Sequence, residues 1–137
     1  MKNLALALAM TLLLAACSSG STVAPQDVTL NGVFTGTFEN TDGMQGGTAT
    51  FNFSQATDST VVSGNAIFDT TTLLNTCRVN GTFTGTNNGA NLTITIGASN
   101  IQFAISDNGN TLSGTYVTEA SATCSNESGS GTITLTR

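Results

Sequence analysis

Side chains that could carry out chemistry are scarce in this chain of 137 residues. It has eight carboxylates, three cysteines, three basic residues and no histidine. Without histidine, neither a Ser-His-Asp triad nor a Cys-His nucleophile system can form. A pair of carboxylates, as in glycoside hydrolysis, is the remaining catalytic option, and no spacing in the sequence places two of them across a cleft. We therefore expect no enzymatic activity and no cofactor.

Metal ligands are equally few. A zinc site would have to use carboxylates alone, whereas zinc in proteins is bound mainly by cysteine and histidine. The segment 107–110, Asp-Asn-Gly-Asn, is similar to the start of a calcium loop but lacks the bidentate acid at the far end. The same residues are typical of a tight turn with positive φ angles. We expect a turn here and no metal site.

The N-terminal residues point to export and covalent lipidation. A single positive charge at Lys2 precedes an apolar run from Leu4 to Ala16. This run is shorter than the roughly 20 residues that span a bilayer, and the arrangement is typical of a secretory signal. Residues 14–17, Leu-Ala-Ala-Cys, resemble the lipobox of bacterial lipoprotein precursors. The alternative is an ordinary signal peptide with a chance cysteine.

The lipobox resemblance implies that residues 1–16 are a cleaved signal peptide and that Cys17 becomes the acylated first residue. Two or three acyl chains would give a stable membrane anchor, since each buried CH₂ contributes about 0.8 kcal/mol. Ser18 stands where an aspartate often marks retention in the inner membrane, so the resemblance implies sorting to the outer membrane. Residues 17–28 would be the lipidated cysteine and a flexible tether, followed by a folded domain at 29–137.

The two remaining cysteines, Cys77 and Cys124, predict a disulfide. Export would place them in an oxidising compartment, where pairing is the default. The bond would close a loop of 46 residues. The chain-entropy model predicts that such a bond stabilises the fold by about 4 kcal/mol. A redox or metal site would need closer thiols or histidine partners. We therefore expect a structural Cys77–Cys124 bond.

The charge balance of the mature chain excludes one class of partner. Lys2 would leave with the signal peptide. The mature chain would then carry two basic residues, Arg78 and Arg137, and eight carboxylates. No basic patch is available to neutralise phosphates, which argues against nucleic-acid binding. Threonine, serine, asparagine and glycine supply most of the polarity, and this composition favours strands joined by tight turns.

Apolar and polar residues alternate with a period of two through most of the domain. Eight strands are expected, at 30–38, 49–53, 62–68, 79–85, 92–96, 101–105, 112–116 and 131–135. All seven phenylalanines and Tyr116 fall on the apolar face, so one face should be buried and the threonine-rich face exposed. The exceptions, which would be scattered exposed apolar residues, are Val33, Val61, Ile67 and Val117.

Eight short consecutive strands predict an antiparallel meander, and closing it removes the exposed edges. An eight-stranded up-and-down barrel is therefore the expected architecture, with a two-sheet sandwich as the alternative. The segment 31–37 recurs almost unchanged at 80–86, through duplication or as a shared device for starting strands. Inward glycines would let bent strands approach closely; clearance for a ligand is the other interpretation.

The mature region resembles the small Gly/Thr-rich bacterial lipoproteins with lipocalin-like β-barrels. That resemblance is architectural and supplies no functional residues. The Gly-x-Trp motif of true lipocalins has no counterpart, because the chain has no tryptophan.

In such a meander, the connections alternate between the two ends of the barrel. The end where the first strand begins would hold the short connections, and the opposite end the three long ones, Thr41–Gly47, Asp69–Thr76 and Glu119–Ser130. Long loops on a rigid scaffold commonly carry binding sites. The long-loop end would collect a candidate binding rim of Glu39, Asp42, Asp69, Arg78, Glu119 and Glu127. The alternative is that these carboxylates only keep the surface soluble.

Two functions follow for a membrane-anchored protein of this kind. In the first, the barrel core is filled by side chains and the domain is a binding or envelope-interaction module for an unknown protein partner. In the second, the barrel carries a small apolar ligand inside. Seven inward phenylalanines favour the first, since eight strands enclose an interior that side chains can just fill.

Overall fold

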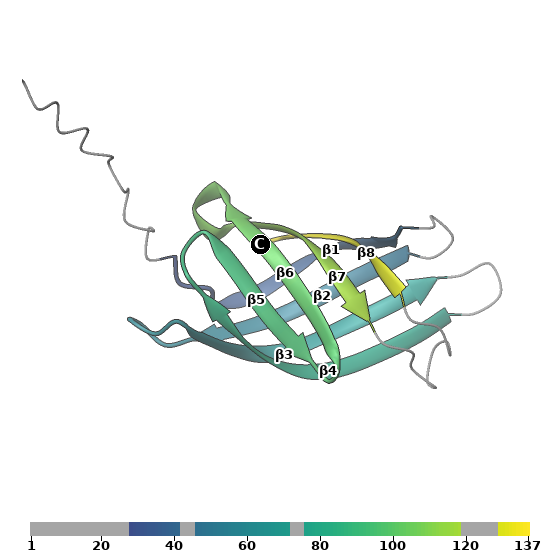
Figure 1. Cartoon of the computed structure of the whole chain (residues 1–137), viewed down its shortest axis with the longest axis horizontal. Helices are drawn as coiled ribbons and strands as arrows, with labels where there is room; N and C mark the ends of the chain where they lie inside the picture. Colours follow the sequence, from purple (N-terminus) through teal and green to yellow (C-terminus); the bar gives the residue numbers. More distant parts are fainter. Residues whose placement is uncertain (1–27, 42–45, 72–75, 119–128) are drawn as a thin grey trace, which may run out of the picture.

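The computed structural model describes residues 28–41, 46–71, 76–118 and 129–137. These form eight strands and one short 3₁₀ turn, η1 (Asp107–Gly109). The strands are β1 (Gly32–Asn40), β2 (Gly46–Gln55), β3 (Val61–Thr71), β4 (Thr76–Asn87), β5 (Asn91–Ile96), β6 (Ser99–Ser106), β7 (Thr111–Thr118) and β8 (Gly129–Thr136) (Figure 1).

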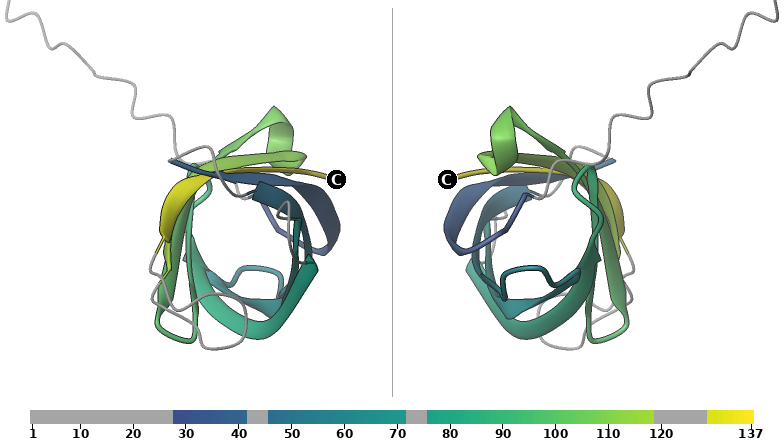
Figure 2. Two further views of the ribbon diagram at one scale, coloured as in Figure 1. Left: turned by 90° about the vertical axis from the view of Figure 1, so that its right-hand side faces the viewer. Right: turned by 90° about the vertical axis from the view of Figure 1, so that its left-hand side faces the viewer.

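The strands form one closed antiparallel barrel in sequence order. Each strand pairs with the next, and β8 pairs back onto β1 with Phe38 opposite Ile133. Figure 2 shows the resulting ring from its two ends. The predicted up-and-down barrel is therefore confirmed, and the two-sheet sandwich is wrong, because closure leaves a single continuous sheet.

The apolar face of every strand lies inside the barrel. Among the described residues, sixteen hydrophobic ones form the buried core, which includes Phe34, Phe51 and Phe103. Aromatic contacts with ring centroids 5.0 to 6.1 Å apart join all seven phenylalanines and Tyr116 into one network. The inside–outside assignment made from period-two alternation is thus confirmed.

The outer wall is polar, with the predicted apolar exceptions. Val33, Val61 and Val117 are exposed, while Ile67 is half-buried. Threonines occupy neighbouring outward positions on paired strands, for example Thr35 between Thr50 and Thr136. Threonine suits such positions because its β-branched side chain packs well on a pleated surface.

Inward glycines mark places where neighbouring strands approach closely. A Cβ added at Gly36 would lie 1.8 Å from the carbonyl oxygen of Thr134, and one at Gly114 would lie 1.9 Å from that of Gln102. The close approach expected for these glycines is therefore confirmed. The repeated segment is not a shared device for starting strands, because Gly32 begins β1 whereas Gly81 lies in the middle of β4.

The two ends of the barrel can be defined by its connections. We call the end where β1 begins the proximal end; it holds the connections 56–60, 88–90 and 107–110. The distal end holds the connections between β1 and β2, β3 and β4, β5 and β6, and β7 and β8. The connections alternate between the two ends as expected, but the predicted separation of short from long ones is wrong. The connections 41–45 and 72–75 are no longer than 56–60, the β5–β6 connection at 97–98 is the shortest, and only 119–128 is long. The reason is that β2, β3 and β4 extend further toward the distal end than the alternation predicts. Residues 42–45, 72–75 and 119–128 lie outside the described residues.

The chain that enters β1 closes the proximal end. Leu30 is fully buried, and Val28, the last residue of the predicted tether, packs against the core. Two buried polar side chains hold this segment. The backbone N–H of Leu30 donates to Oε1 of Gln55 at 2.8 Å, and the amide of Asn87 donates to the carbonyl of Val28 and to Gln55 Oε1.

Arg137, which follows β8, forms hydrogen bonds to other segments at the same end. Its guanidinium donates to the carbonyls of Asn31 and Gly109 and to the side chain of Asn110, at 3.1 to 3.2 Å. It also lies 5.1 Å from the ring centroid of Phe34, a cation–π arrangement. These contacts connect three separate segments and cover the core from outside.

The turn at 107–110 has the predicted backbone conformation. Asp107, Asn108 and Gly109 all have positive φ angles, between 52° and 86°. Aspartate, asparagine and glycine tolerate this left-handed region best, which explains why the sequence places them there.

Candidate functional site

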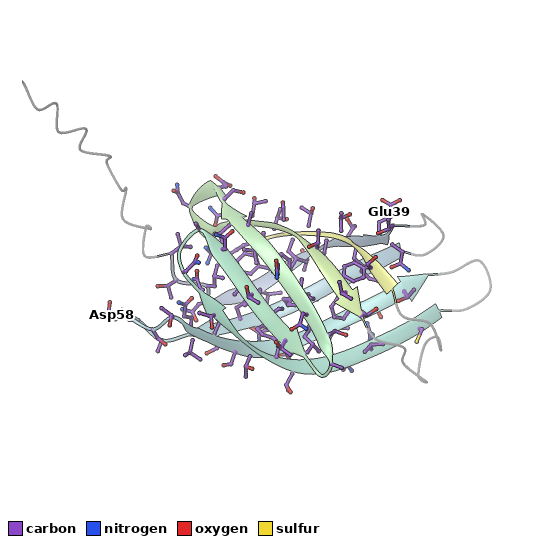
Figure 3. All side chains as sticks on the ribbon, viewed as in Figure 1. Glu39 and Asp58 are labelled. Atoms are coloured by element: carbon purple, nitrogen blue, oxygen red, sulfur yellow. The ribbon has the colours of Figure 1, made fainter. Side chains whose placement is uncertain are left out.

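The distal end is the candidate site, and three of its six predicted residues are described. Glu39 lies on the outer face near the end of β1, Asp69 near the end of β3 and Arg78 near the start of β4. The other three, Asp42, Glu119 and Glu127, lie outside the described residues. Figure 3 places Glu39 at the opposite end of the barrel from Asp58, which lies in the proximal connection between β2 and β3.

Asp69 and Arg78 form an ion pair instead of standing as separate rim charges. They lie directly opposite each other in the β3–β4 ladder. Arg78 Nε lies 2.6 Å from Oδ1 of Asp69, and the second guanidinium nitrogen lies 2.9 Å from Oδ2. This two-point geometry is the favoured one for arginine and a carboxylate.

The pair changes the acidity of both groups. The hydrogen bond from Arg78 lowers the pKa of Asp69 below its ordinary value, and the same bond raises the pKa of Arg78. The Arg78 side chain is 64% exposed and the Asp69 side chain 34%, so solvent screens the attraction and limits its effect on stability. At this position the two charges cancel.

Glu39 differs from Asp69 in its surroundings. It is exposed and faces Gly46 on β2 and Thr132 on β8, neither of which can neutralise it. Among the described residues it takes part in no ion pair. Glu39 is therefore the described rim carboxylate that is available to a partner.

Aromatic side chains lie beneath the distal rim. Phe38 contacts Phe68 and Tyr116 edge-to-face, with centroids 5.6 and 6.0 Å apart. Tyr116 is buried, and its hydroxyl donates to the side chain of Asn40. Phe38, Phe68 and Ile96 are only partly buried. Partly buried rings therefore lie below the distal rim, whereas the partly buried apolar residues at the proximal end are the aliphatic Val28 and Ile105.

The buried polar pair at the proximal end, Gln55 and Asn87, was not among the residues predicted from the sequence. Gln55 continues the inward positions of Phe51 and Phe53, and Asn87 continues those of Phe83 and Gly85. The alternation that predicts the core residues therefore also predicts that these two polar side chains point inward. Both side chains are satisfied, and no described buried side-chain polar atom lacks a hydrogen-bond partner.

The cysteine predictions rest on residues that are only partly described. Cys77 lies near the distal start of β4 and is half-buried. Cys17 and Cys124 lie outside the described residues. The Cys77–Cys124 disulfide and the lipidation of Cys17 both stay predictions.

The described residues contain neither a metal-binding cluster nor a membrane-spanning helix. No group of three or more histidine, cysteine, aspartate or glutamate side chains there could hold a metal ion. In the same residues, no helix has both the length and the apolar character needed to cross a bilayer.

Comparison with known proteins does not assign the chain to a family. No protein-family description, curated protein or solved structure matches the chain. The resemblance to lipocalin-like lipoproteins is therefore supported only at the level of an eight-stranded antiparallel barrel with a buried aromatic core.

Proposed function

We propose that this protein is a lipid-anchored, non-enzymatic module of the bacterial cell envelope, in the outer membrane, that binds a partner at the distal end of a filled barrel. The observation that carries the proposal is the difference between the two ends. The proximal end is closed by the chain that leads toward Cys17, and Gln55 and Asn87 fix that chain. An anchor on Cys17 would therefore turn the closed end toward the membrane.

The filled core supports a binding surface over an internal carrier. The aromatic network runs along the interior from Phe34 to Tyr116, through ring pairs whose centroids lie 5.2 to 6.0 Å apart. A ligand inside would have to displace these rings. A partner at the distal rim would instead meet Glu39, which lies on the rigid barrel, at the end that also carries the longest connection, 119–128.

A photo-crosslinking pair tests the choice of end. A photoreactive amino acid replaces Glu39 in one variant and Asp58 in the other, since both are exposed and lie at opposite ends. Crosslinking in the intact envelope of the source cells should give a discrete adduct from position 39 and none from position 58. Adducts from position 58 alone would contradict the proposal.

Neutralising the rim tests its chemistry. The triple variant Glu39→Gln, Asp42→Asn, Glu119→Gln should bind the partner identified by crosslinking more weakly than the wild-type protein does. Its circular dichroism spectrum should stay unchanged. Asp58→Asn, Asp107→Asn is the matched control at the proximal end. Equal binding by both variants would leave the carboxylates with a role in solubility only.

The anchor is tested separately. Replacing Cys17 with serine should abolish labelling by radioactive palmitate and leave the precursor uncleaved by the lipoprotein signal peptidase. Normal labelling of that variant would overturn the lipid anchor without affecting the distal-end proposal.

One observation favours the alternative function, a carrier of a small apolar ligand. Phe38, Phe68 and Ile96 are partly buried near the distal end, so an apolar molecule could contact them there. Native mass spectrometry of protein purified from its own host separates the two. A ligand that co-purifies in stoichiometric amount supports the carrier.

A further inference from the structure

A hollow of about 290 Å³ lies on the outer wall of the barrel, over β5, β6 and β7. It is separate from the distal rim. Its lining consists of the exposed side chains of Asn91, Thr93, Gln102, Ala104 and Thr115, with the backbone of Leu92, Phe103 and Gly114 between them. Those last three residues lie at inward positions, so only their backbone reaches the outer face.

One small outward residue contributes to the hollow. Ala104 lies opposite Asn91 on β5 and Ser113 on β7, and its methyl group leaves space between them. Gly114 lies at an inward position, where β7 approaches β6 so closely that an added Cβ would lie 1.9 Å from Gln102 O. The hollow therefore follows from the small side chain of Ala104 between larger outward neighbours.

The side chains around the hollow share one kind of chemistry. Thr93, Gln102 and Thr115 form a row across three strands, directly opposite one another in register. Together with Asn91 they supply two amides and two hydroxyls, which both donate and accept hydrogen bonds. Within the described ranges these four side chains bond to no other residue, and no charged residue lines the hollow.

We propose that this hollow binds one ring of an uncharged saccharide. Sugar hydroxyls need neighbouring donors and acceptors, which the two amides and two hydroxyls provide. The methyl groups of Ala104 and the threonines would contact the C–H face of the ring. The volume lies just below the usual range for ligand pockets, about 300 to 1,000 Å³, which fits a single ring. The absence of charge in the lining disfavours acidic sugars.

The hollow and the distal rim lie on different parts of the barrel, so this inference does not depend on the function proposed above. A saccharide in the hollow would leave Glu39 exposed. Loss of saccharide binding and loss of the distal partner are therefore distinguishable outcomes.

The test is a nuclear magnetic resonance titration of the chain from Ser18 to Arg137, which contains all eight strands of the closed barrel. N-acetylglucosamine is the probe. Saturable shifts should appear at the side-chain amides of Asn91 and Gln102 and at the backbone of Ala104 and Thr115. Glucuronate, the charged control, should give weaker shifts. A tetramer of N-acetylglucosamine that binds at least as tightly would identify a glycan chain as the source; an excluded tetramer would identify a free sugar.

Matched variants make the test decisive. Asn91→Ala, Thr115→Ala should weaken binding about five-fold for each hydrogen bond lost. Asn65→Ala, Thr82→Ala removes an equivalent outward pair on β3 and β4 and should leave binding unchanged. Ala104→Leu fills the hollow without removing a polar group and should abolish binding. Absence of saturable shifts, or equal losses in both alanine pairs, would overturn the proposal.

Discussion

The proximal and distal ends of the barrel are closed by different means. At the proximal end, buried amides and a terminal arginine bind an incoming segment of backbone, and Leu30 and Phe34 are fully buried behind it. At the distal end, Phe38 and Phe68 are partly buried, and the Asp69–Arg78 pair is exposed. The described part of the barrel therefore has one end closed by buried hydrogen bonds and one end with partly buried aromatic rings and exposed charges.

The largest expected effect comes from two phenylalanines on the same strand. Phe34→Ala should destabilise the fold by about 3 to 5 kcal/mol, the usual cost of removing a fully buried phenylalanine. Phe38→Ala should cost clearly less, because its ring is only partly buried. Urea denaturation of both variants measures the difference. Equal losses would show that the distal interior is as tightly packed as the proximal one.

The predicted disulfide would make the distal end depend on a covalent bond. Cys77→Ser, Cys124→Ser should reduce the free energy of unfolding by about 2 to 4 kcal/mol. The control is the wild-type chain in reducing agent, which should lose a similar amount. Two reactive thiols in the exported wild-type protein would contradict the pairing.

Hydrogen bonds at the two ends should also differ in strength. Gln55→Ala removes the acceptor of the Leu30 N–H and of the Asn87 amide in a buried site, so we expect a loss of about 2 to 3 kcal/mol. Asn40→Ala at the distal end removes only the partner of the Tyr116 hydroxyl among the bonds described here, and should cost about 1 kcal/mol. Hydrogen exchange should localise the first change to Leu30. Unchanged exchange there would show that Gln55 does not hold the lead-in segment.

The smallest effect concerns pH. Arg78 lowers the pKa of Asp69 in the folded state, so the pair stabilises the fold above the unfolded pKa of the carboxyl group. This contribution is lost as pH falls through the lower, folded pKa. Thermal unfolding between pH 2 and 6 should therefore show a small acid loss that is reduced in Arg78→Gln. An identical pH profile in that variant would mean that the exposed pair contributes nothing measurable.

Some features of this molecule follow from local sequence alone. Alternation placed Phe51 and Phe53 inside and Thr50 and Asn52 outside, because successive side chains of a strand point to opposite faces. Residues 107–110 indicated a turn because their types tolerate positive φ. Export and lipidation of Cys17 are likewise predictions from the sequence, and they depend on residues outside the described part.

Other features required the register and closure of the sheet. Asp69 meets Arg78 only because β3 and β4 pair in one particular register. Arg137 reaches Asn31 because β8 returns to β1, which joins residues far apart in the chain.

The sequence by itself determined which face of each strand is buried, since that depends on a two-residue period within one segment. The tertiary structure alone decided which end is sealed, which charges cancel and where the outer wall is hollowed. Those properties depend on which residues of neighbouring strands lie side by side, and a shift of one residue in register would change all of them.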